Sequence, residues 1–578
     1  DTFTPSGSEP VFTGTMNGLG HTINNLTINR ADESQVGLFR TTGSDSVIRS
    51  IGLVDANVAG AFAVGGLVGQ NKGEIIQSYV SGTVSGTVLA DGQPADNIQA
   101  ALSGMNVGGL AGINNGSITQ SHATSSVNGA SLVGGLVGYN TYKISQSYAT
   151  GMVNGKNQVG GLAGYTNGTV AQSYATGMVS GIDQIGGLAG YLGFTSNISQ
   201  SYATGAVTGV NDVGGLVGGN SNLRDLTNNT TSEIEEIKDV GGNITQSYAT
   251  GTVTGENNVG GLVGFNDGTS SQNYATGMVI GKKNVGGLAG VNARSSPYEY
   301  NVSISQSYAT GSVTSDSFIG GLVGYNKANA TISQSYASGL INGKAETNLA
   351  SGILLGLDDY SAMKTPAELQ QLDTFAGWDI NAEGGTDSSV WRLYEGHTAP
   401  LLRSFLTALE VSTQDTTVTY NGSEQSGSWS ANTPYDAALV LGNPTGGKNA
   451  GTYALDLSGL YSGQQGYDLI TTGSGTLTIN KAQATVTANS NTTTYNGTEQ
   501  SVSGFTVDGL VNGEDQSVLS GVTTSGGKGT NAGSYTLTAR GSDGNYELTF
   551  VDGTLTIDRK TITADVRALD KLFDGSLA

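Results

Sequence analysis

A nine-fold internal repeat is the feature that most constrains how this chain folds. The motif Gln-Ser-Tyr-Ala-Thr-Gly, with small variations, and the motif Gly-Gly-Leu followed by Val-Gly or Ala-Gly each occur nine times. From the Gln to the next Gly pair the distance is 14 residues in seven of eight cases, whereas from a Gly pair to the next Gln it varies from 12 to 32. Constant segments pack against their copies, and variable ones are surface loops, because added loop length costs little closure entropy. We therefore expect a solenoid with its insertions on one face.

The residue pattern within each copy favours β-strands over helices. Each copy is rich in Gly and β-forming residues, which helical repeats avoid. In one copy, Ala149 and Val153 share one face of an extended strand, and Tyr148 and Thr150 share the other. A turn of roughly 26 residues fits a coil of about three short strands, each paired with its copy about 4.8 Å away. The sequence therefore predicts an all-β chain that begins with a right-handed parallel β-helix over residues 1–364.

Two aliphatic stacks and one corner are expected inside this β-helix. A Val or Ile precedes every Gly pair and a Leu follows it, so both rows should point inward. Their spacing of three residues breaks strand alternation. We expect the Gly pair to form a bulge or corner, because glycine adopts positive φ at little cost.

The Tyr of each copy predicts a ladder of aromatic side chains on the outer face, interrupted only by His122. Stacked aromatic side chains stabilise a parallel sheet, and they also offer an apolar platform on which sugar rings could stack. Tyr148, Tyr174 and Tyr202 are therefore the candidate ligand-binding residues.

The remainder of the chain divides into four further segments. Thr365-Pro366-Ala367-Glu368 has the pattern of a capping box, and with the Trp residues that follow it predicts a plug at the end of the coil over residues 365–404. A second repeat then begins, in which Thr-Tyr-Asn-Gly, Asn-Ala-Gly and Gly-Thr-Leu-Thr-Ile recur after 75 to 82 residues. We expect small β-sandwich-like domains at 405–481 and 482–559, and the start of a truncated third at 560–578.

These motifs carry a family resemblance. The Gly-Gly-Leu and Gln-Ser-Tyr-Ala-Thr-Gly pair resembles the GLUG motif of large bacterial exoproteins, and the downstream repeat is similar to their MBG repeats. Leu-Phe-Asp-Gly at 572–575 is similar to their YDG modules. The resemblance implies a filamentous-haemagglutinin-like adhesin that is secreted or held at the bacterial surface. It further implies two-partner secretion, with an outer-membrane partner for the full-length protein, and it carries over no binding-site residue.

The composition excludes several other classes. The net charge is −22, and no Arg stands between Arg49 and Arg224, which excludes nucleic acid as a partner because phosphate binding needs clustered cations. No apolar run reaches the roughly 18 residues of a membrane span, so we expect no membrane insertion. The chain has no Cys, so its stability is expected to come from stacking rather than from cross-links.

Two groups of acidic residues are candidates for chemistry. The insert at 220–242 holds five carboxylates that could bind Ca²⁺, although no cofactor is required and their spacing is not that of a known calcium loop: Asp225, Glu233, Glu235, Glu236 and Asp239. Asp183 and Asp212 stand on adjacent copies and could form the carboxylate pair of a glycosidase, or they could be turn residues like the Asn residues at matching positions.

The sequence therefore favours a non-enzymatic adhesin or biofilm-matrix protein. It would bind a polysaccharide or a cell-surface ligand through the loops that differ between copies. A carbohydrate-active β-helix enzyme and a purely structural spacer are the alternatives.

Overall fold

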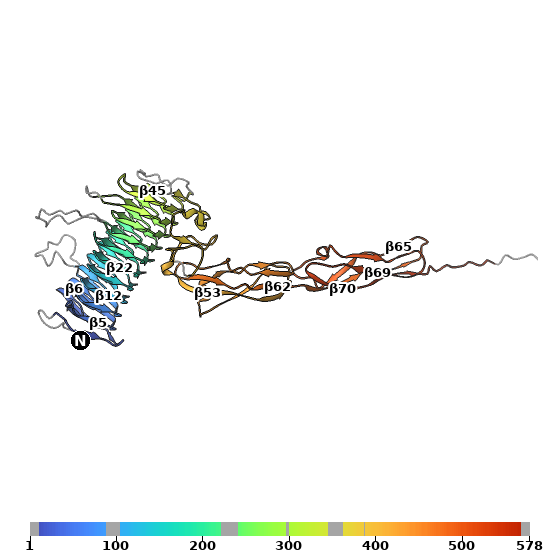
Figure 1. The fold of residues 1–578 in the computed structure, drawn as a ribbon, viewed down its shortest axis with the longest axis horizontal. Helices are drawn as coiled ribbons and strands as arrows, with labels where there is room; N and C mark the ends of the chain where they lie inside the picture. Colours follow the sequence, from blue (N-terminus) through green and yellow to red (C-terminus); the bar gives the residue numbers. More distant parts are fainter. Residues whose placement is uncertain are drawn as a thin grey trace, which may run out of the picture. The chain divides into compact units, whose positions relative to one another are not determined.

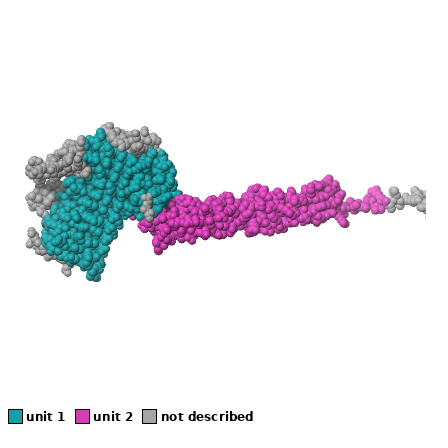
Figure 2. Space-filling view, in the orientation of Figure 1, with its two compact units in different colours: residues 1–406 teal, residues 407–578 magenta. Residues whose placement is uncertain are grey.

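The computed structural model describes residues 11–87, 104–220, 241–295, 300–344, 362–385 and 388–567. The chain divides into two compact units, Asp1–Leu406 and Thr407–Ala578 (Figure 2). The described regular structure of both units consists of β-strands and short 3-10 helices (Figure 1). The predicted all-β class is therefore confirmed.

Each complete coil of the first unit repeats the same short strands. Tyr148 pairs with Tyr174 of the following coil, Val153 with Val179 and Val159 with Ile185, all in parallel. Identical sequence positions thus lie in register, which follows from the constant repeat length. The strands of one coil are β17 (Lys143–Ser145), β18 (Tyr148–Ala149), β19 (Val153–Asn154), β20 (Asn157–Gly160) and β21 (Ala163–Thr166).

The stacked coils form three parallel sheets, which make a parallel β-helix as predicted. One sheet has 11 strands, from β1 (Thr15–Asn17) to β47 (Thr331–Ser333), and a second has 10, from β4 (Phe39–Thr41) to β46 (Val323–Asn326). The third has 28 and contains β18, β19 and β20 of the coil above. Figure 1 shows β12 (Ser117–Thr119), β22 (Thr169–Ala171) and β45 (Ser317–Gly320) at successive levels of the stack.

The interior of the β-helix is lined by the two predicted aliphatic stacks. Val133 and Leu136, which flank a Gly pair, are both fully buried, and so are their equivalents in the neighbouring coils. Ile144 and Ala149 add further inward rows. Each coil therefore buries its apolar side chains against copies of itself, as expected for a solenoid.

A buried ladder of Asn side chains runs beside the aliphatic stacks, and the sequence analysis did not foresee it. Asn71 Nδ2 donates to Asn114 Oδ1 at 2.8 Å, Asn114 Nδ2 to Asn140 Oδ1 at 2.8 Å, and Asn140 Nδ2 to Thr166 Oγ1 at 2.9 Å. All four side chains are fully buried. The rows of amides satisfy one another between coils, as buried polar groups must.

Replacing Asn140 by Ala is expected to destabilise its coil by about 2–3 kcal/mol, because it leaves the buried Asn114 amide and Thr166 hydroxyl short of partners. Native-state hydrogen exchange of β16 (Val137–Asn140) and β17 would measure the loss. Asn140→Thr is the control, because Thr166 occupies the same row naturally and should cost less than half as much. Equal losses for the two variants would contradict the ladder's role.

The Gly pairs lie at a corner, as predicted, but the predicted reason is wrong. β15 (Ser131–Gly134) ends at the first Gly of one pair and β16 begins two residues after the second, Gly135. Neither glycine has positive φ. A Cβ on Gly135 would instead lie 2.1 Å from the carbonyl oxygen of Gly161 in the next coil. Close approach of stacked backbones, rather than unusual φ, therefore requires glycine at this corner.

The segment predicted as a plug packs against the side of the β-helix and not across its end. Its capping box forms, since the Thr365 amide donates to Glu368 Oε2 at 2.7 Å and the Glu368 amide to Thr365 Oγ1 at 3.2 Å. The capping box is followed by a short 3-10 helix and not by an α-helix. The elements of this segment are η2 (Glu368–Gln370), η3 (Leu372–Phe375), β50 (Ile380–Asn381), β51 (Trp391–Arg392), β52 (Leu401–Leu402) and η4 (Arg403–Phe405). We call the described part of residues 365–405 the side cap.

The second unit contains two sets of strands that correspond to the downstream repeat. We call residues 407–480 module one and residues 482–558 module two. Strands pair only within each set among the described residues, and the small mixed sheets agree with the β-sandwich-like prediction. Module one contains β53 (Thr407–Gln414), β54 (Thr416–Thr419), β55 (Gln425–Ser426), β56 (Ser428–Ala431), η5 (Ala437–Leu439), β57 (Leu441–Gly442), β58 (Gly446–Gly447), β59 (Gly451–Ala454), β60 (Leu460–Tyr461), β61 (Tyr467–Thr472) and β62 (Thr476–Asn480). Module two contains β63 (Ala482–Ala488), β64 (Asn491–Thr494), β65 (Gln500–Ser501), β66 (Phe505–Asp508), η6 (Gln516–Val518), β67 (Thr523–Gly526), β68 (Lys528–Gly529), β69 (Gly533–Arg540), β70 (Tyr546–Val551) and β71 (Gly553–Asp558).

Candidate attachment surface

The predicted aromatic ladder exists on the outer face of the 28-stranded sheet. Tyr148 and Tyr174 open the strands β18 and β23 (Tyr174–Ala175), and their ring centroids are 4.8 Å apart with planes 5° from parallel. His122 lies in the same row, 4.9 Å from Tyr79 and 4.5 Å from Tyr148. The row continues from Tyr174 to Tyr202, Tyr248, Tyr274 and Tyr308 with spacings of 4.8 to 5.1 Å. Strand alternation turns these side chains outward, because Ala149 next to Tyr148 is buried.

The side cap covers the C-terminal half of this ladder. Tyr248, Tyr274, Tyr308 and Tyr336 are only 2 to 5% exposed. Phe405 meets the rings of Tyr202 and Tyr248 at 82° and 85°, and the Tyr308 hydroxyl donates to the carbonyl oxygen of Pro400 at 2.7 Å. Burial raises the pKa of Tyr274 well above its ordinary value, with the neighbouring Tyr308 and Tyr248 adding to the effect. The side cap therefore uses half of the ladder as an internal binding face.

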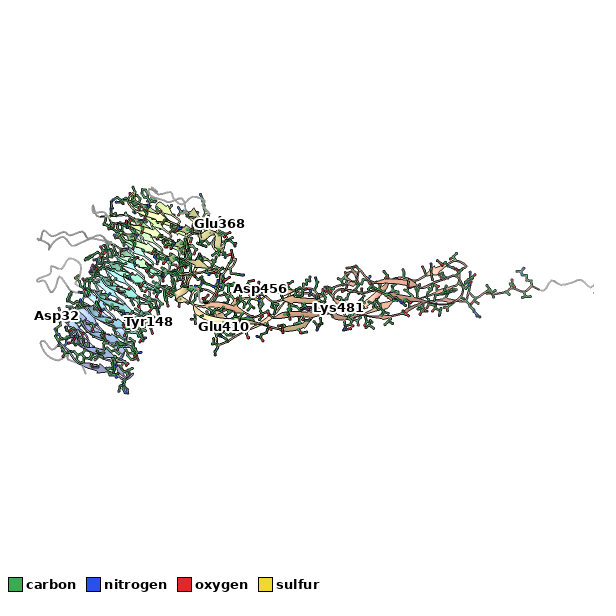
Figure 3. The ribbon with its side chains drawn as sticks, viewed as in Figure 1. Asp32, Tyr148, Glu368, Glu410, Asp456 and Lys481 are labelled. Atoms are coloured by element: carbon green, nitrogen blue, oxygen red, sulfur yellow. The ribbon has the colours of Figure 1, made fainter. Side chains whose placement is uncertain are left out.

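The N-terminal half of the ladder is open to solvent. Tyr79, His122, Tyr148 and Tyr174 are half-buried, and Tyr202 lies at the edge of the side cap. We call these five residues the open ladder. Figure 3 places Tyr148 on the side of the β-helix that also carries Glu368 of the side cap. The candidate ligand residues Tyr148, Tyr174 and Tyr202 therefore do lie together on one surface.

The parallel stacking of the open ladder determines what it can contact. The faces of Tyr148 and Tyr174 lie against neighbouring rings, so ring edges rather than faces point to solvent. A sugar ring therefore cannot stack face to face on these rings in the way that the sequence suggested. Burial raises the pKa of Tyr202 to about 12, with a contribution from Tyr174, and burial lowers the pKa of His122. Both shifts favour the neutral forms of these two side chains.

Rows of neutral polar and thioether side chains run beside the open ladder. On one side lies a row of Gln side chains, in which Gln146 Nε2 donates to Gln172 Oε1 at 3.4 Å. On the other side Thr150 and Thr176 are exposed, and beyond them Met152 and Met178 are 43% and 54% exposed. We call the open ladder with these flanking rows the open strip. It combines apolar ring edges with amide and hydroxyl groups, the mixture that is typical of ligand-binding surfaces.

The Gln row shows a feature that the sequence analysis missed. Gln146 and Gln172 have φ of 49° and 50°, in the left-handed region that non-glycine residues rarely adopt. The same conformation recurs at the Gln of every copy. The nine-fold repetition of Gln directly before the small residue was the available signal. The turn directs each Gln side chain outward, while the next residue, such as Ser147, is buried.

The other two candidate sites do not gain support as chemical centres. The five insert carboxylates Asp225, Glu233, Glu235, Glu236 and Asp239 lie outside the described residues. Asp183 accepts a hydrogen bond from Asn211 Nδ2 at 2.5 Å, and Asp212 accepts one from Asn258 Nδ2 at 2.8 Å. Both carboxylates therefore belong to hydrogen-bonded rows of Asn side chains on successive coils, at the positions where other copies have Asn. They lie in strands β25 (Asp183–Gly186) and β30 (Asn211–Gly214), and not in turns as the alternative supposed. Burial raises the pKa of Asp212, the Asn258 hydrogen bond opposes this, and Asp183 adds to it.

Within the part of the chain that the structure describes, no three His, Cys, Asp or Glu side chains gather in a group that could hold a metal ion. No helix among the same residues is long and apolar enough to cross a membrane.

Comparisons with known proteins agree with the two repeat classes. The GLUG motif matches at residues 60–85, 129–154 and 183–208, and the MBG domain (YGX type) matches at residues 484–556. These matches confirm both resemblances and fit a GLUG- and MBG-containing large surface protein. Halomucin of Haloquadratum walsbyi is 43% identical over 89 residues, which are 15% of this chain and 1% of Halomucin. The chain thus spans only about 1% of the length of that relative.

One solved structure also matches part of this chain. It is a crystal structure of a Bacteroides ovatus protein described as an immunoglobulin A1 protease, with 16% identity, 70% of this chain covered and 82% of that chain. The TM-score is 0.19, which is too low to support any argument about fold or activity.

Proposed function

We propose that this chain acts at the cell surface, or after secretion, as an attachment protein, and that the open strip is its attachment face. One observation carries the proposal: the chain covers half of its aromatic ladder with its own side cap and leaves the other half open to solvent. The GLUG and MBG matches support a surface location. The resemblance to large exoproteins implies two-partner secretion, and we propose the same export route for this chain.

The ligand that we propose is a neutral polysaccharide. The described side chains of the open strip are Gln, Tyr, His, Thr and Met, none of which carries a full charge at neutral pH. Sugar hydroxyls can exchange hydrogen bonds with the Gln and Thr rows, and the C–H groups of sugar rings can pack on the tyrosine edges. The net charge of −22 disfavours acidic polymers through long-range repulsion. Because the rows repeat with every coil, a linear polymer can contact several coils at once.

We further propose that the chain is not an enzyme. Asp183 and Asp212 each accept a hydrogen bond from an Asn side chain of the next coil. The side chains that define the open strip include no pair of carboxylates. This leaves the structural spacer as the alternative that the experiment must separate from attachment.

The proposal predicts that the double variant Tyr148→Ser/Tyr174→Ser weakens binding to a neutral polysaccharide by about tenfold or more, since each aromatic contact contributes about 0.5–1.5 kcal/mol. Binding would be measured on immobilised neutral and acidic polysaccharides, with Ca²⁺ and with a chelator. The Ca²⁺ arm also tests the acidic insert.

A second tyrosine stack provides the matched control. Tyr139 and Tyr165 lie 5.0 Å apart on the outer face of the 10-stranded sheet, away from the open strip. Tyr139→Ser/Tyr165→Ser removes the same groups and should leave binding unchanged. Equal losses in the two double variants would indicate a general effect on the fold. If the unmodified chain bound none of the polysaccharides, the result would favour the alternative that the chain is a structural spacer. If it bound only aromatic peptides that resemble the side cap, the ligand would be a peptide and not a polysaccharide.

A further inference from the structure

The contact between module one and module two is built around one carboxylate. The Tyr420 hydroxyl of module one donates to Glu514 Oε1 at 2.6 Å, and the Tyr546 hydroxyl of module two donates to Glu514 Oε2 at 2.6 Å. The two rings meet edge to face, 5.4 Å apart at 81°. Tyr420 is only 4% exposed. The carboxylate therefore accepts one strong hydrogen bond from each module.

Two turns of module one complete the contact. Gly422, in the Tyr-Asn-Gly turn, accepts a hydrogen bond through its carbonyl oxygen from Asn512 Nδ2 at 3.2 Å. The Ala450 amide, in the Asn-Ala-Gly turn, donates to Asn545 Oδ1 at 2.9 Å, and Asn545 Nδ2 donates to Asn449 Oδ1 at 3.2 Å. Module one thus contributes the two turns, and module two contributes Glu514, Asn512 and Asn545.

Module two repeats the first of these turns with the same internal geometry. In module two the Tyr495 amide donates to the Asp558 carbonyl oxygen at 2.9 Å. The equivalent bond in module one runs from the Tyr420 amide to the Asn480 carbonyl oxygen, at 2.8 Å. The glycine of the turn has φ of 84°, against 78° at Gly422.

The Asn-Ala-Gly turn is repeated in the same way. The Tyr535 hydroxyl donates to the Asn531 carbonyl oxygen at 2.9 Å, and the Tyr453 hydroxyl donates to that of Asn449 at 2.8 Å. Module two therefore presents both turns that module one uses for docking. We call Tyr495–Gly497 with Asn531–Gly533 the second docking face.

The second docking face is preformed and uncovered among the described residues. Tyr495 is 37% exposed, whereas its counterpart Tyr420 is 4% exposed. A Cβ on Gly422 would lie 2.6 Å from Asn512, but a Cβ on Gly497 would have no atom within 4 Å. The two faces thus share their backbone geometry and differ in whether a module covers them.

The residues that follow module two indicate what covers this face. The segment after module two can be aligned with the start of module two, because Arg559 follows the last strand of module two as Lys481 follows the last strand of module one. In this alignment Ile562 corresponds to Ala484, and Val566 corresponds to Ala488. Ala484 and Ala488 are 4% and 1% exposed inside β63, whereas Ile562 and Val566 are 85% and 87% exposed. Two large apolar side chains at strand spacing are left without the sheet that buries their counterparts. They match the first strand of another module of this type.

We propose that the second docking face binds a further β module of the same kind, joined in tandem through the segment that contains Ile562 and Val566, which would become the first strand of that module. That module would present a Glu and two Asn at the positions of Glu514, Asn512 and Asn545. Repeat proteins gain stability from such nearest-neighbour contacts, so each added module stabilises the one before it. This inference concerns the second unit alone and does not depend on which ligand the open strip binds.

The test is a chain in which a second copy of residues 481–558 follows Asp558 and replaces the residues after it, so that Lys481 of the copy takes the place of Arg559. Hydrogen exchange at Tyr495–Gly497 and Asn531–Gly533 is expected to slow by about tenfold or more relative to the unextended chain, the effect of one charge-assisted hydrogen bond. Tyr495→Phe, which removes only the hydroxyl, should abolish most of this gain. In the unextended chain the same substitution should change nothing, whereas Tyr420→Phe should speed exchange at the existing contact.

Two results would overturn the proposal. In the first, the added copy is protected at its own strands, which shows that it is folded, yet exchange at Tyr495 is as fast as in the unextended chain. In the second, protection at Tyr495 rises with the concentration of the unextended chain, which would show that a second molecule, and not a tandem module, covers the face.

Discussion

Replacing Gly135 by Ala is expected to destabilise the coils on both sides of it by about 3 kcal/mol, because the added methyl has no room. A Cβ at this position would lie 2.1 Å from the Gly161 carbonyl oxygen and 2.8 Å from the Ala149 Cβ. The first contact is with the backbone of the next coil, which is held by parallel pairing on both sides and cannot rotate away as a flexible side chain could. The loss should appear as faster hydrogen exchange in β15 and β20, since stacked repeats can open locally.

Gly14→Ala is the matched control within the same unit. A Cβ on Gly14 would have only ordinary contacts, of 3.7 and 3.8 Å, with the Phe12 ring. This variant should be within about 0.5 kcal/mol of the unmodified chain, as is usual for surface substitutions. If Gly135→Ala had equally little effect, the coils would have to be able to separate at this corner, and the close approach would not explain the Gly pairs.

The register of the β-helix could be predicted because the repeat is nearly constant. When Val159 and Ile185 stand at the same point of successive copies, parallel stacking brings them together without further information. The same argument gave the tyrosine ladder and the inward Leu residues. The same parallel register extends to a degenerate copy before the first complete one, where Val36 pairs with Val64 and Phe39 with Val68.

What lies outside the repeat could not be placed in the same way. Trp378 and Trp391 indicated that residues 365–404 pack against something apolar, but nothing in their pattern distinguishes the end of the coil from its side. The tyrosine ladder is the apolar outer face that the repeat itself creates, and the side cap packs there. Likewise, the Tyr420 and Glu514 pair joins residues 94 apart that stand at different points of their modules, so the period of the repeat does not relate them.

Replacing Trp391 by Ala is expected to release the side cap from the ladder, at a cost of about 3–5 kcal/mol. Trp391 is fully buried, and its ring lies 6.4 Å from Tyr274, 5.9 Å from Tyr308 and 5.0 Å from Trp378. It is the side chain through which β51 reaches the ladder, and β51 also pairs with β50 and β52. Hydrogen exchange at Arg392 and Leu402 should therefore accelerate, while the coils under the cap keep their protection.

Release of the cap also tests whether the ladder is an attachment face. In Trp391→Ala the rings from Tyr248 to Tyr336 become accessible and extend the open ladder over further coils, so binding to the neutral polysaccharide should increase if ring edges and Gln and Thr rows form the binding surface. Trp391→Phe keeps an aromatic ring against Tyr274 and Tyr308, so it should retain most of the cap's protection and leave binding at the original level. If the cap opened and binding did not increase, attachment would depend on something specific to the open coils, such as His122, and not on the ladder as a repeated surface.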